Sequence, residues 1–437
     1  MRGFGATALN PIATAIIQLG SVPILLHAWG ATKYGDWLLL SAIPSYLTLS
    51  DLGLGAASGS DMSMRVAADD REGALETFQS SWLLITAISF VVLLLGLFFV
   101  WLVPWQQWLK LSSISSHEAA EVISVLGVYV VLLQQNGIVE SGYRSDGYFA
   151  TGTLWLTIQR LAEALAGMIV AGAGGSLLAV AFAYLAVGAL GVIGYSLFLR
   201  RLSPWIRFGI RHVRLKTVRR MAVPAFGFMA FPLGYALSLQ GFTIAIGSVL
   251  GPIAVVSFST LRTLSRLSLQ IAVVIKHGLW PELSRAFGTG DVSLARRLHR
   301  HACQASLALS AFGGSFLWLA GPYIYRLWIR DGVRFDAACF HILLLGVIVN
   351  SVWETSSVIP ISTNAHCRIA MVYSGVIFLS LGLARVLMPG LGTMGAAVAL
   401  LAADGCMAAI VLHTALSQVA DTPKRFFVAL FEVAPEG

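Results

Sequence analysis

Charged side chains are scarce in this sequence. Only 11% of its 437 residues are Asp, Glu, Lys or Arg, against roughly 25% in soluble domains. Hydrophobic residues make up 57% of the chain, and the mean hydropathy is +0.79. A water-soluble fold could not cover its surface with so few charges, so we expect the lipid bilayer to be the solvent of this protein.

Cysteine is also rare, and its spacing excludes two roles. Cys303, Cys339, Cys367 and Cys406 are far apart, form no C-x-x-C pair and fall mostly inside apolar runs. This pattern predicts small packing residues rather than a disulfide framework or a metal site. The run from His299 to Cys303 contains residues of metal-ligand type, but it lies where a loop enters a helix, so we predict no metal there.

Signals for nucleotide chemistry and for a cleaved leader are missing as well. The glycine-rich run from Gly53 to Gly59 has the wrong spacing for a nucleotide loop and follows no strand, and there is no Walker lysine. We therefore predict no cofactor, and energy supplied by an ion gradient, the membrane potential or the substrate gradient. Met1 and Arg2 lead directly into a run of spanning length without a cleavage site, so we expect the first helix to stay attached.

Long apolar runs recur through the rest of the chain. A spanning helix needs about 20 mostly apolar residues, and this rule predicts an all-α polytopic membrane protein of about twelve spanning helices. They are expected at 4–28, 35–58, 79–103, 121–143, 153–172, 176–199, 222–249, 254–280, 302–325, 336–361, 369–389 and 393–416. Several contain Pro, Gly, Asn or Gln, which indicates either helices that line a cavity or ordinary kinks in a packed bundle.

The distribution of lysine and arginine predicts the orientation. With both termini in the cytoplasm, nineteen of the 29 Lys and Arg residues fall in cytoplasmic segments and five in outer ones. Positive loops stay inside, so we expect a multi-pass protein of the inner (plasma) membrane with both termini cytoplasmic. The net charge of +8 follows from this topology and gives no argument for nucleic-acid binding.

A basic segment divides the chain into two halves. Eight Lys and Arg residues between 200 and 220 alternate with apolar residues, a pattern suited to an anionic membrane surface. It is either a positive-inside linker or a regulatory or partner-docking segment. The predicted domains are an N-terminal six-helix lobe at 1–199, this linker at 200–221, a C-terminal six-helix lobe at 222–416 and a cytoplasmic tail at 417–437.

The two halves resemble each other in sequence. One offset of 221 residues brings the segment from Gly30 to Asp70 onto the segment from Gly251 to Asp291. The same offset brings Asp61 onto Glu282 and Ala74 onto Ala295. Such an internal repeat is the usual organisation of secondary transporters.

Three cations are expected in the predicted eighth helix. On a continuous helix, Arg262, Arg266 and Lys276 would share one face over about 21 Å. Each Arg or Lys near the bilayer centre costs about 2.5–3.5 kcal/mol on insertion scales. Facing lipid they would be hard to tolerate, whereas a water-filled cavity with a phosphate-bearing guest would stabilise them. The alternative is that they pair with acids in the membrane or, for Lys276, extend to the interface.

Acidic residues inside the other predicted helices could supply those partners or carry a coupled proton or sodium ion. They are Asp51, Glu140, Glu163, Glu354 and Asp404. Arg160 stands three residues before Glu163 on the same helix, so this pair is expected to be structural, although Arg160 also remains a candidate for substrate binding. The sequence does not rank the acids.

The strongest motifs lie between Gly30 and Trp82. They are the Gly-x-x-x-Tyr-Gly-x-Trp pattern from Gly30 to Trp37, the Ser-Asp-Leu-Gly-Leu-Gly turn from Ser50 to Gly55, and the Asp69-Asp70-Arg71 loop. The region resembles bacterial polysaccharide (O-antigen type) flippases. In the second half, Trp280 to Leu283 with Gly290-Asp291 resembles the wider multidrug, oligosaccharidyl-lipid and polysaccharide exporter superfamily.

This resemblance implies two six-helix lobes arranged as an inverted V and a role in O-antigen, lipopolysaccharide or exopolysaccharide biosynthesis. The implied activity is alternating-access transfer of a lipid-linked oligosaccharide, of the undecaprenyl-pyrophosphate type, from the cytoplasmic to the periplasmic leaflet. Membrane lipids and a polysaccharide polymerase or ligase are the further expected partners. An ion-coupled multidrug or metabolite exporter of the same superfamily is the alternative, and the predicted cations argue against it. A membrane enzyme acting on lipid-linked sugars is disfavoured because the longest outer loop, about 104–120, offers only Lys110, His117 and Glu118 as chemical groups.

Overall fold

The computed structural model describes residues 2–330, 332–363 and 366–431, without the side chains of 2–12, 222–231, 270–278, 281 and 366. No strand occurs in these ranges, so the predicted all-α class is confirmed. The chain divides into two compact units, unit 1 (Met1–Ile253) and unit 2 (Ala254–Gly437). Each unit is described by itself below.

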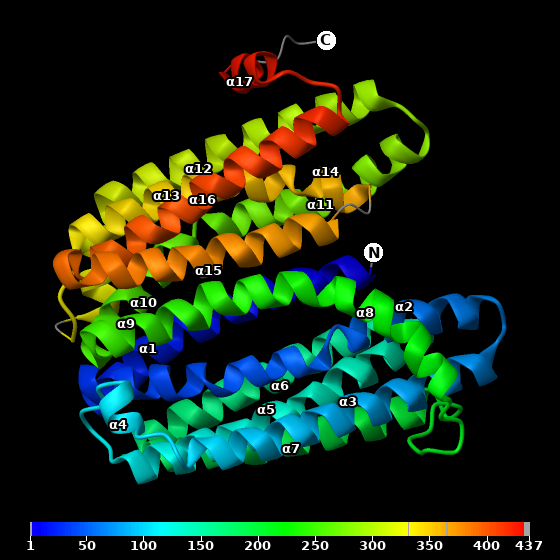
Figure 1. The fold of residues 1–437 in the computed structure, drawn as a ribbon, viewed down its shortest axis with the longest axis horizontal. Coiled ribbons are helices and arrows are strands. Elements are labelled where there is room, and N and C mark those ends of the chain that lie inside the picture. The colour runs from blue at the N-terminus through cyan, green and yellow to red at the C-terminus, as the bar shows by residue number, and fades with distance from the viewer. Residues whose placement is uncertain (1, 331, 364–365, 432–437) are drawn as a thin grey trace. The chain divides into compact units, whose positions relative to one another are not determined.

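Unit 1 is a bundle of long helices joined by short turns (Figure 1). Its elements are α1 (Arg2–Ala42), η1 (Pro44–Asp51), α2 (Leu54–Ala67), α3 (Arg71–Val100), α4 (Trp105–Trp108), α5 (Ser116–Ser145), α6 (Phe149–Gly172), α7 (Leu177–Leu202), α8 (Leu215–Ala236), the π turn η2 (Leu237–Gly241) and α9 (Phe242–Leu250). Within this bundle α5 packs against α2, α3 and α7, and α6 packs between α1 and α7. Phe78, Tyr143 and Tyr195 are fully buried in its core.

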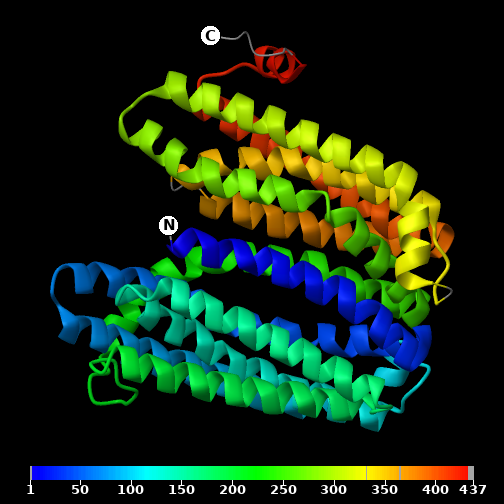
Figure 2. The same ribbon diagram turned by 180° about the vertical axis from the view of Figure 1, so that it is seen from behind.

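Unit 2 is a second helical bundle, seen from behind in Figure 2. Its elements are α10 (Pro252–Arg266), which begins at the end of unit 1, α11 (Leu269–Gly288), α12 (Val292–Ile329), α13 (Ala337–Ser356), α14 (Val358–Ser362), α15 (His366–Leu391), α16 (Thr393–Gln418) and α17 (Pro423–Phe431). Helix α16 packs between α13 and α15, and α12 packs against α11 and α13. The short α17 lies across the start of α12.

Polar residues at the helix starts explain where several helices begin. Ser115 and Glu118 form a reciprocal capping box at α5, and the Ser176 hydroxyl accepts a hydrogen bond from the Ala179 backbone at α7. Asp336 caps α13 in the same way. Each cap satisfies a backbone N–H that the first helical turn leaves without a partner.

The membrane-spanning segments agree with the sequence prediction. Ten helical segments in the described ranges are long and apolar enough to cross a bilayer, as expected for a multi-pass membrane protein. One of them, Ala13–Ala67, contains the first two predicted helices, which meet at a sharp kink at Gly30. Of the twelve predicted helices, only the one at 254–280 has no counterpart among these ten segments of the described ranges. It is divided between α10 and α11.

The backbone conformation shows the same internal repeat as the sequence. Gly30 has φ 71° and ψ 172°, and its counterpart Gly251 has φ 87° and ψ 177°. This conformation lies in the region that favours glycine, which explains why both copies have glycine there. Forty residues later Asp70 and Asp291 cap α3 and α12, each accepting a hydrogen bond from the backbone three residues ahead. The predicted repeat is therefore present in both units.

The second helix of each copy is broken, which the sequence analysis did not predict. In unit 1 the expected helix 35–58 is interrupted by η1 and by left-handed Leu52 (φ 52°) and Gly53 (φ 76°). In unit 2 the expected helix 254–280 stops at Arg266 and restarts at Leu269. The expectation of an unbroken helical face from Arg262 to Lys276 is therefore wrong, because a constant rotation per residue does not continue across the break.

The basic segment is docked on unit 1 and is not a continuous amphipathic helix. After α7 ends at Leu202 it runs as an irregular strap, defined here as residues 203–214, before α8 begins. The Gln79 side chain donates to the Arg207 carbonyl (2.9 Å) and accepts from the His212 backbone (2.8 Å). Phe208 packs on Phe78 and Trp82, and Ile206 is fully buried.

The boundary between the two compact units does not coincide with either of the predicted domain boundaries. Helices α8 and α9 pack on unit 1, because α8 contacts α2 and α3 and α9 contacts α1. The division therefore falls at Ile253. The predicted boundaries at 199 and 221 follow the sequence repeat and stay a prediction. Residues 432–437 of the predicted tail lie outside the described residues.

Candidate functional site

The buried charges of unit 2 gather around Asp404 on α16. Its Oδ1 accepts hydrogen bonds from Asn350 Nδ2 (2.9 Å) and Trp353 Nε1 (3.0 Å), both on α13. Arg262 and Arg266 on α10 interact electrostatically with the same carboxylate. Two of the predicted cations and one of the predicted acids thus come together from two helices, α10 and α16, that are distant in sequence.

Arg262 is the buried arginine of this group. Its exposed fraction is 9%, and it interacts electrostatically with Arg266, Tyr373 and Asp404. Tyr373, on α15, places its ring 5.6 Å from that of Trp353. We define the arginine–aspartate cluster as Arg262, Arg266, Asn350, Trp353, Tyr373 and Asp404.

The cluster has the composition of an anion site. A buried guanidinium is stabilised by a nearby carboxylate, but Arg262 and Arg266 also repel each other. A phosphate brought to the pair would reduce that repulsion and could accept paired hydrogen bonds from a planar guanidinium. Asp404 is fixed by two neutral donors, so it can remain in place while a guest approaches the arginines.

Unit 1 contains a buried acid, Glu163, on α6. It is 4% exposed; its Oε2 accepts from Tyr129 Oη on α5 (2.7 Å) and its Oε1 accepts from Gln159 Nε2 (2.9 Å). Tyr184 on α7 packs with its ring edge-to-face on Tyr129. The predicted Arg160–Glu163 pair is present as an electrostatic interaction, while both of these hydrogen bonds come from other residues.

Glycines of α7 make room for this acid and its neighbours. A Cβ at Gly188 would lie 2.9 Å from the Tyr129 ring and 3.4 Å from Glu163 Oε1. A Cβ at Gly191 would lie 2.4 Å from the Gln159 side chain. We define the Glu163 network as Tyr129, Gln159, Glu163 and Tyr184.

The remaining predicted site residues are not members of these two groups, although Arg160 interacts electrostatically with Glu163. Asp51 Oδ1 accepts from the Gly55 backbone N–H (3.1 Å) and so caps α2 after the break. Glu140 is paired with Arg144 (3.8 Å) near the end of α5, and Glu354 is partly buried on α13. Arg160 is exposed on unit 1. The side chain of Lys276 lies outside the described residues.

Sequence reasoning missed the neutral members of both groups. Tyr129, Gln159, Asn350, Trp353 and Tyr373 are polar or amphipathic residues inside predicted spanning helices, and that position was their only signal. Their role becomes visible when helices that are distant in sequence pack together. Four of them belong to the candidate site because they fix the carboxylates that sequence reasoning had singled out, and Tyr373 belongs to it because it interacts with Arg262.

The motif that carries the family resemblance is largely structural. Tyr34 and Trp37 are 5% and 7% exposed, and a Cβ at Gly35 would lie 2.3 Å from the Pro252 carbonyl oxygen. Asp36 is fully buried and holds the loop before α5, because its Oδ2 accepts from the Ser113 backbone (2.9 Å). These residues pack the turn after Gly30.

Similar solved structures share the fold of the whole chain. An inward-facing multidrug resistance MATE family transporter of the MOP superfamily superposes with a TM-score of 0.78 at 13% identity, over 95% of this chain and 98% of that one. The lipid II flippase MurJ in an inward closed conformation has a TM-score of 0.72 at 14% identity, covering 97% and 90%. A MATE transporter in complex with MaL6 has a TM-score of 0.60 at 14% identity, covering 95% and 96%. The sequence matches no protein-family model and no curated protein. Because the identities are only 13–14%, these similarities show a shared fold and nothing more.

Proposed function

We propose that this protein is a flippase that moves a lipid-linked oligosaccharide, of the undecaprenyl-pyrophosphate type, from the cytoplasmic to the periplasmic leaflet by alternating access. In this proposal it serves O-antigen or another surface polysaccharide, and a polymerase or ligase receives its product. It lies in the inner membrane with both termini in the cytoplasm. The transported molecule is not chemically changed, so the protein is not an enzyme.

The observation that carries the proposal is the arginine–aspartate cluster of unit 2. A buried arginine inside a spanning bundle is costly, and such residues mark substrate or ion pathways. Two arginines beside one fixed carboxylate favour a guest that brings further negative charge. A pyrophosphate provides this charge and offers oxygens that match the guanidinium plane.

The fold supports the same class of function. Two of the solved structures that share it are described as a multidrug resistance MATE family transporter and as a lipid II flippase. Transport of a lipid-linked molecule is therefore compatible with this arrangement of helices. The sequence resemblance to polysaccharide flippases narrows the proposal to lipid-linked oligosaccharides.

A multidrug or metabolite exporter is the second candidate, and the Glu163 network favours it. A buried carboxylate flanked by tyrosine rings could accept a cationic, aromatic guest. The two candidates assign opposite charges to the substrate. In the flippase proposal Glu163 instead belongs with Asp51, Glu140, Glu354 and Asp404 among the groups that could carry a coupled ion.

The test is made in a strain whose surface polysaccharide depends on this gene. The double variant Arg262→Ala with Arg266→Ala is expected to abolish polysaccharide display while the protein level in the membrane stays normal. Arg285→Ala is the matched control, because it removes an exposed arginine of unit 2 that is paired with Glu282. Full display by the double variant, or loss of drug resistance in place of display, would overturn the flippase assignment.

A further inference from the structure

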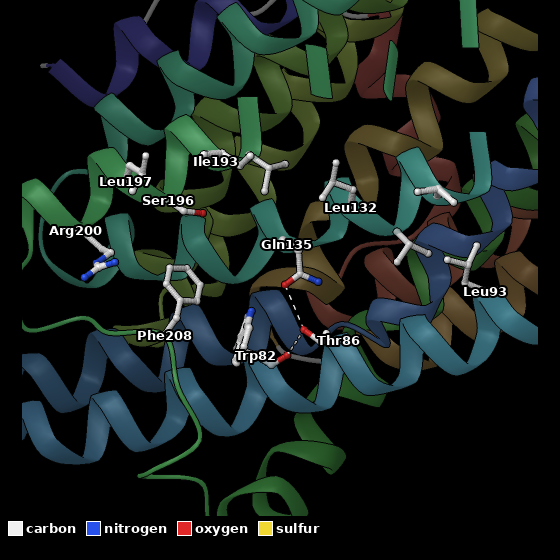
Figure 3. A pocket seen from close by; sticks show the side chains of 13 residues that line it. Trp82, Thr86, Leu93, Leu132, Gln135, Ile193, Ser196, Leu197, Arg200 and Phe208 are labelled. Carbon is white, nitrogen blue, oxygen red and sulfur yellow. Dashed lines mark hydrogen bonds between the residues drawn. The ribbon is translucent and has the colours of Figure 1, made fainter. Parts of the chain in front are cut away.

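An open groove of about 530 Å³ lies on unit 1 between α3, α5 and α7 (Figure 3). Its walls are mostly aliphatic and aromatic, with Leu93 on α3, Leu132 on α5, and Ile193 and Leu197 on α7. Ile193 and Leu197 are each 55% exposed, so the groove opens on the surface of the bundle. In a membrane-spanning helix such a surface is in contact with lipid.

Two of the polar side chains in the wall, Thr86 and Gln135, are linked by a hydrogen bond. The Thr86 hydroxyl donates to the Trp82 carbonyl (2.7 Å) and lies 3.3 Å from Gln135 Oε1, as the dashed lines in Figure 3 show. A buried hydroxyl with a partner does not require water. The middle of the groove is therefore suited to a hydrocarbon chain.

The length of the groove matches one leaflet of a bilayer. Along α3 it extends from Trp82 to Leu93, which are eleven residues apart in the sequence. At 1.5 Å per residue this is about 16 Å, and half of a typical hydrocarbon core of about 30 Å is about 15 Å. One acyl chain of a lipid could lie along it from the headgroup level to the bilayer centre.

One end of the groove carries a positive charge. Arg200, near the end of α7, lines the groove next to Leu197, with Phe208 close by in Figure 3. Arg200 is exposed, and no ion pair is found for it among the residues that the structure describes. Phe208 packs edge-on against Trp82 with ring centroids 5.6 Å apart. Aromatic rings beside a basic side chain are typical of the level of the lipid headgroups.

We propose that this groove binds an anionic phospholipid, with one acyl chain along α3, α5 and α7 and the headgroup phosphate at Arg200. The lipid is a structural ligand, separate from any transported molecule. Because Phe208 belongs to the strap at 203–214 and also lines the groove, the bound lipid stabilises the contact between the strap and α3.

The test uses native mass spectrometry of the full-length protein in detergent, titrated with dioleoyl phosphatidylglycerol or dioleoyl phosphatidylcholine. The wild type is expected to bind the anionic lipid more tightly. Arg200→Gln should weaken phosphatidylglycerol binding about fivefold, since a basic residue near an anionic lipid contributes about 1 kcal/mol. It should weaken phosphatidylcholine binding less, because the choline ammonium offsets the charge of the phosphate. Arg201→Gln is the matched control, because Arg201 is the next residue of α7, is equally exposed and does not line the groove.

A second variant tests the acyl chain. Ser196→Phe fills part of the groove and should weaken binding of both lipids, and Ile193→Trp should do the same from a position that is 55% exposed. Equal loss of phosphatidylglycerol binding in the Arg200 and Arg201 variants would show diffuse attraction to the basic end and overturn the proposal. Unchanged binding in both groove-filling variants would overturn it as well.

Discussion

At the residue scale, the buried carboxylates of this protein are fixed by neutral donors. Glu163 accepts hydrogen bonds from Tyr129 and Gln159, and Asp404 accepts them from Asn350 and Trp353. A carboxylate held in this way keeps its position whether a cation is near or absent. This property suits a site whose charge balance changes when a guest or an ion binds.

The first prediction concerns Glu163. Replacing it by Gln preserves the shape and one acceptor oxygen but removes the charge, so Glu163→Gln should fold while losing ion-dependent transport by about tenfold or more. The measurement is substrate export in vesicles with and without an imposed proton or sodium gradient. Glu282→Gln, which removes an exposed acid paired with Arg285, is the control. An unchanged response to both gradients would exclude Glu163 from coupling.

The second prediction concerns Gly35. Gly35→Ala places a methyl group 2.3 Å from the Pro252 carbonyl oxygen, and overpacking of this kind costs about 1–3 kcal/mol. The melting temperature in detergent should therefore fall by several degrees. Gly20→Ala is the control on the same helix, since a Cβ there meets nothing within 4 Å. Equal melting temperatures for the two variants would contradict the close approach at Gly35.

The same residues show how much of the candidate site could be predicted from the sequence. Charged residues inside apolar runs are visible in one dimension, so Arg262, Glu163 and Asp404 could be singled out. Their partners could not, because Tyr129 reaches Glu163 from another helix and Asn350 reaches Asp404 from 54 residues away. Asp51 shows the opposite case, because it was singled out as an acid inside a spanning helix, whereas its carboxylate accepts a backbone hydrogen bond at the start of α2, within the turn motif from Ser50 to Gly55.

At the scale of the element, the second helix of each copy is broken, and the helical periodicity of the sequence does not predict such a break. In unit 1 the break includes Leu52, whose left-handed conformation is unusual for leucine. In unit 2 no glycine or proline lies between Arg266 and Leu269 to indicate the break. Apolar length therefore predicted the existence and position of these helices correctly but not their interruption. The conformation of the strap at 203–214 could not be predicted either, because alternating basic and apolar residues fit a surface helix as well as a docked loop.

The third prediction concerns α17, which is held by an ion pair. Arg300 Nε and Nη2 donate to Asp421 Oδ2 (2.8 Å) and Oδ1 (2.6 Å), just before α17 begins. Asp421→Asn should loosen α17 and increase trypsin cleavage after Lys424 or Arg425, because a charge-assisted bidentate contact is lost at a cost of about 1–2 kcal/mol. Lys424→Gln is the control for an exposed charge on the same helix. Wild-type cleavage rates at Arg425 in both variants would contradict this role.

The same ion pair predicts a pH dependence. Burial opposes ionisation of Asp421, but hydrogen bonds from Arg300 and the Thr422 backbone outweigh it and hold its pKa below the usual value. A depressed carboxylate pKa contributes stability that is present above the unfolded-state pKa of about 4 and is lost as the pH falls through the folded-state pKa. The difference in melting temperature between wild type and Asp421→Asn should be constant above about pH 5 and shrink below about pH 4. A difference that grows on acidification would contradict this assignment.

At the scale of the whole molecule, the orientation in the membrane is the next prediction. In unit 1 the strap and the loop before α5 lie at opposite ends of α3. In a cysteine-free background, Arg211→Cys should be labelled by an impermeant thiol reagent only after the inner face is opened. Ser112→Cys should be labelled in intact cells. The reverse pattern would invert the proposed topology, because the excess of positive charge would then lie outside.

The central claim is that the arginine–aspartate cluster accepts a phosphate-bearing guest. The most direct measurement is binding of undecaprenyl pyrophosphate to the purified protein, compared with the Arg262→Ala, Arg266→Ala double variant. The account predicts saturable binding to the wild type that weakens at least tenfold in the double variant and persists in Arg285→Ala. Equal binding to the wild type and the double variant would contradict it.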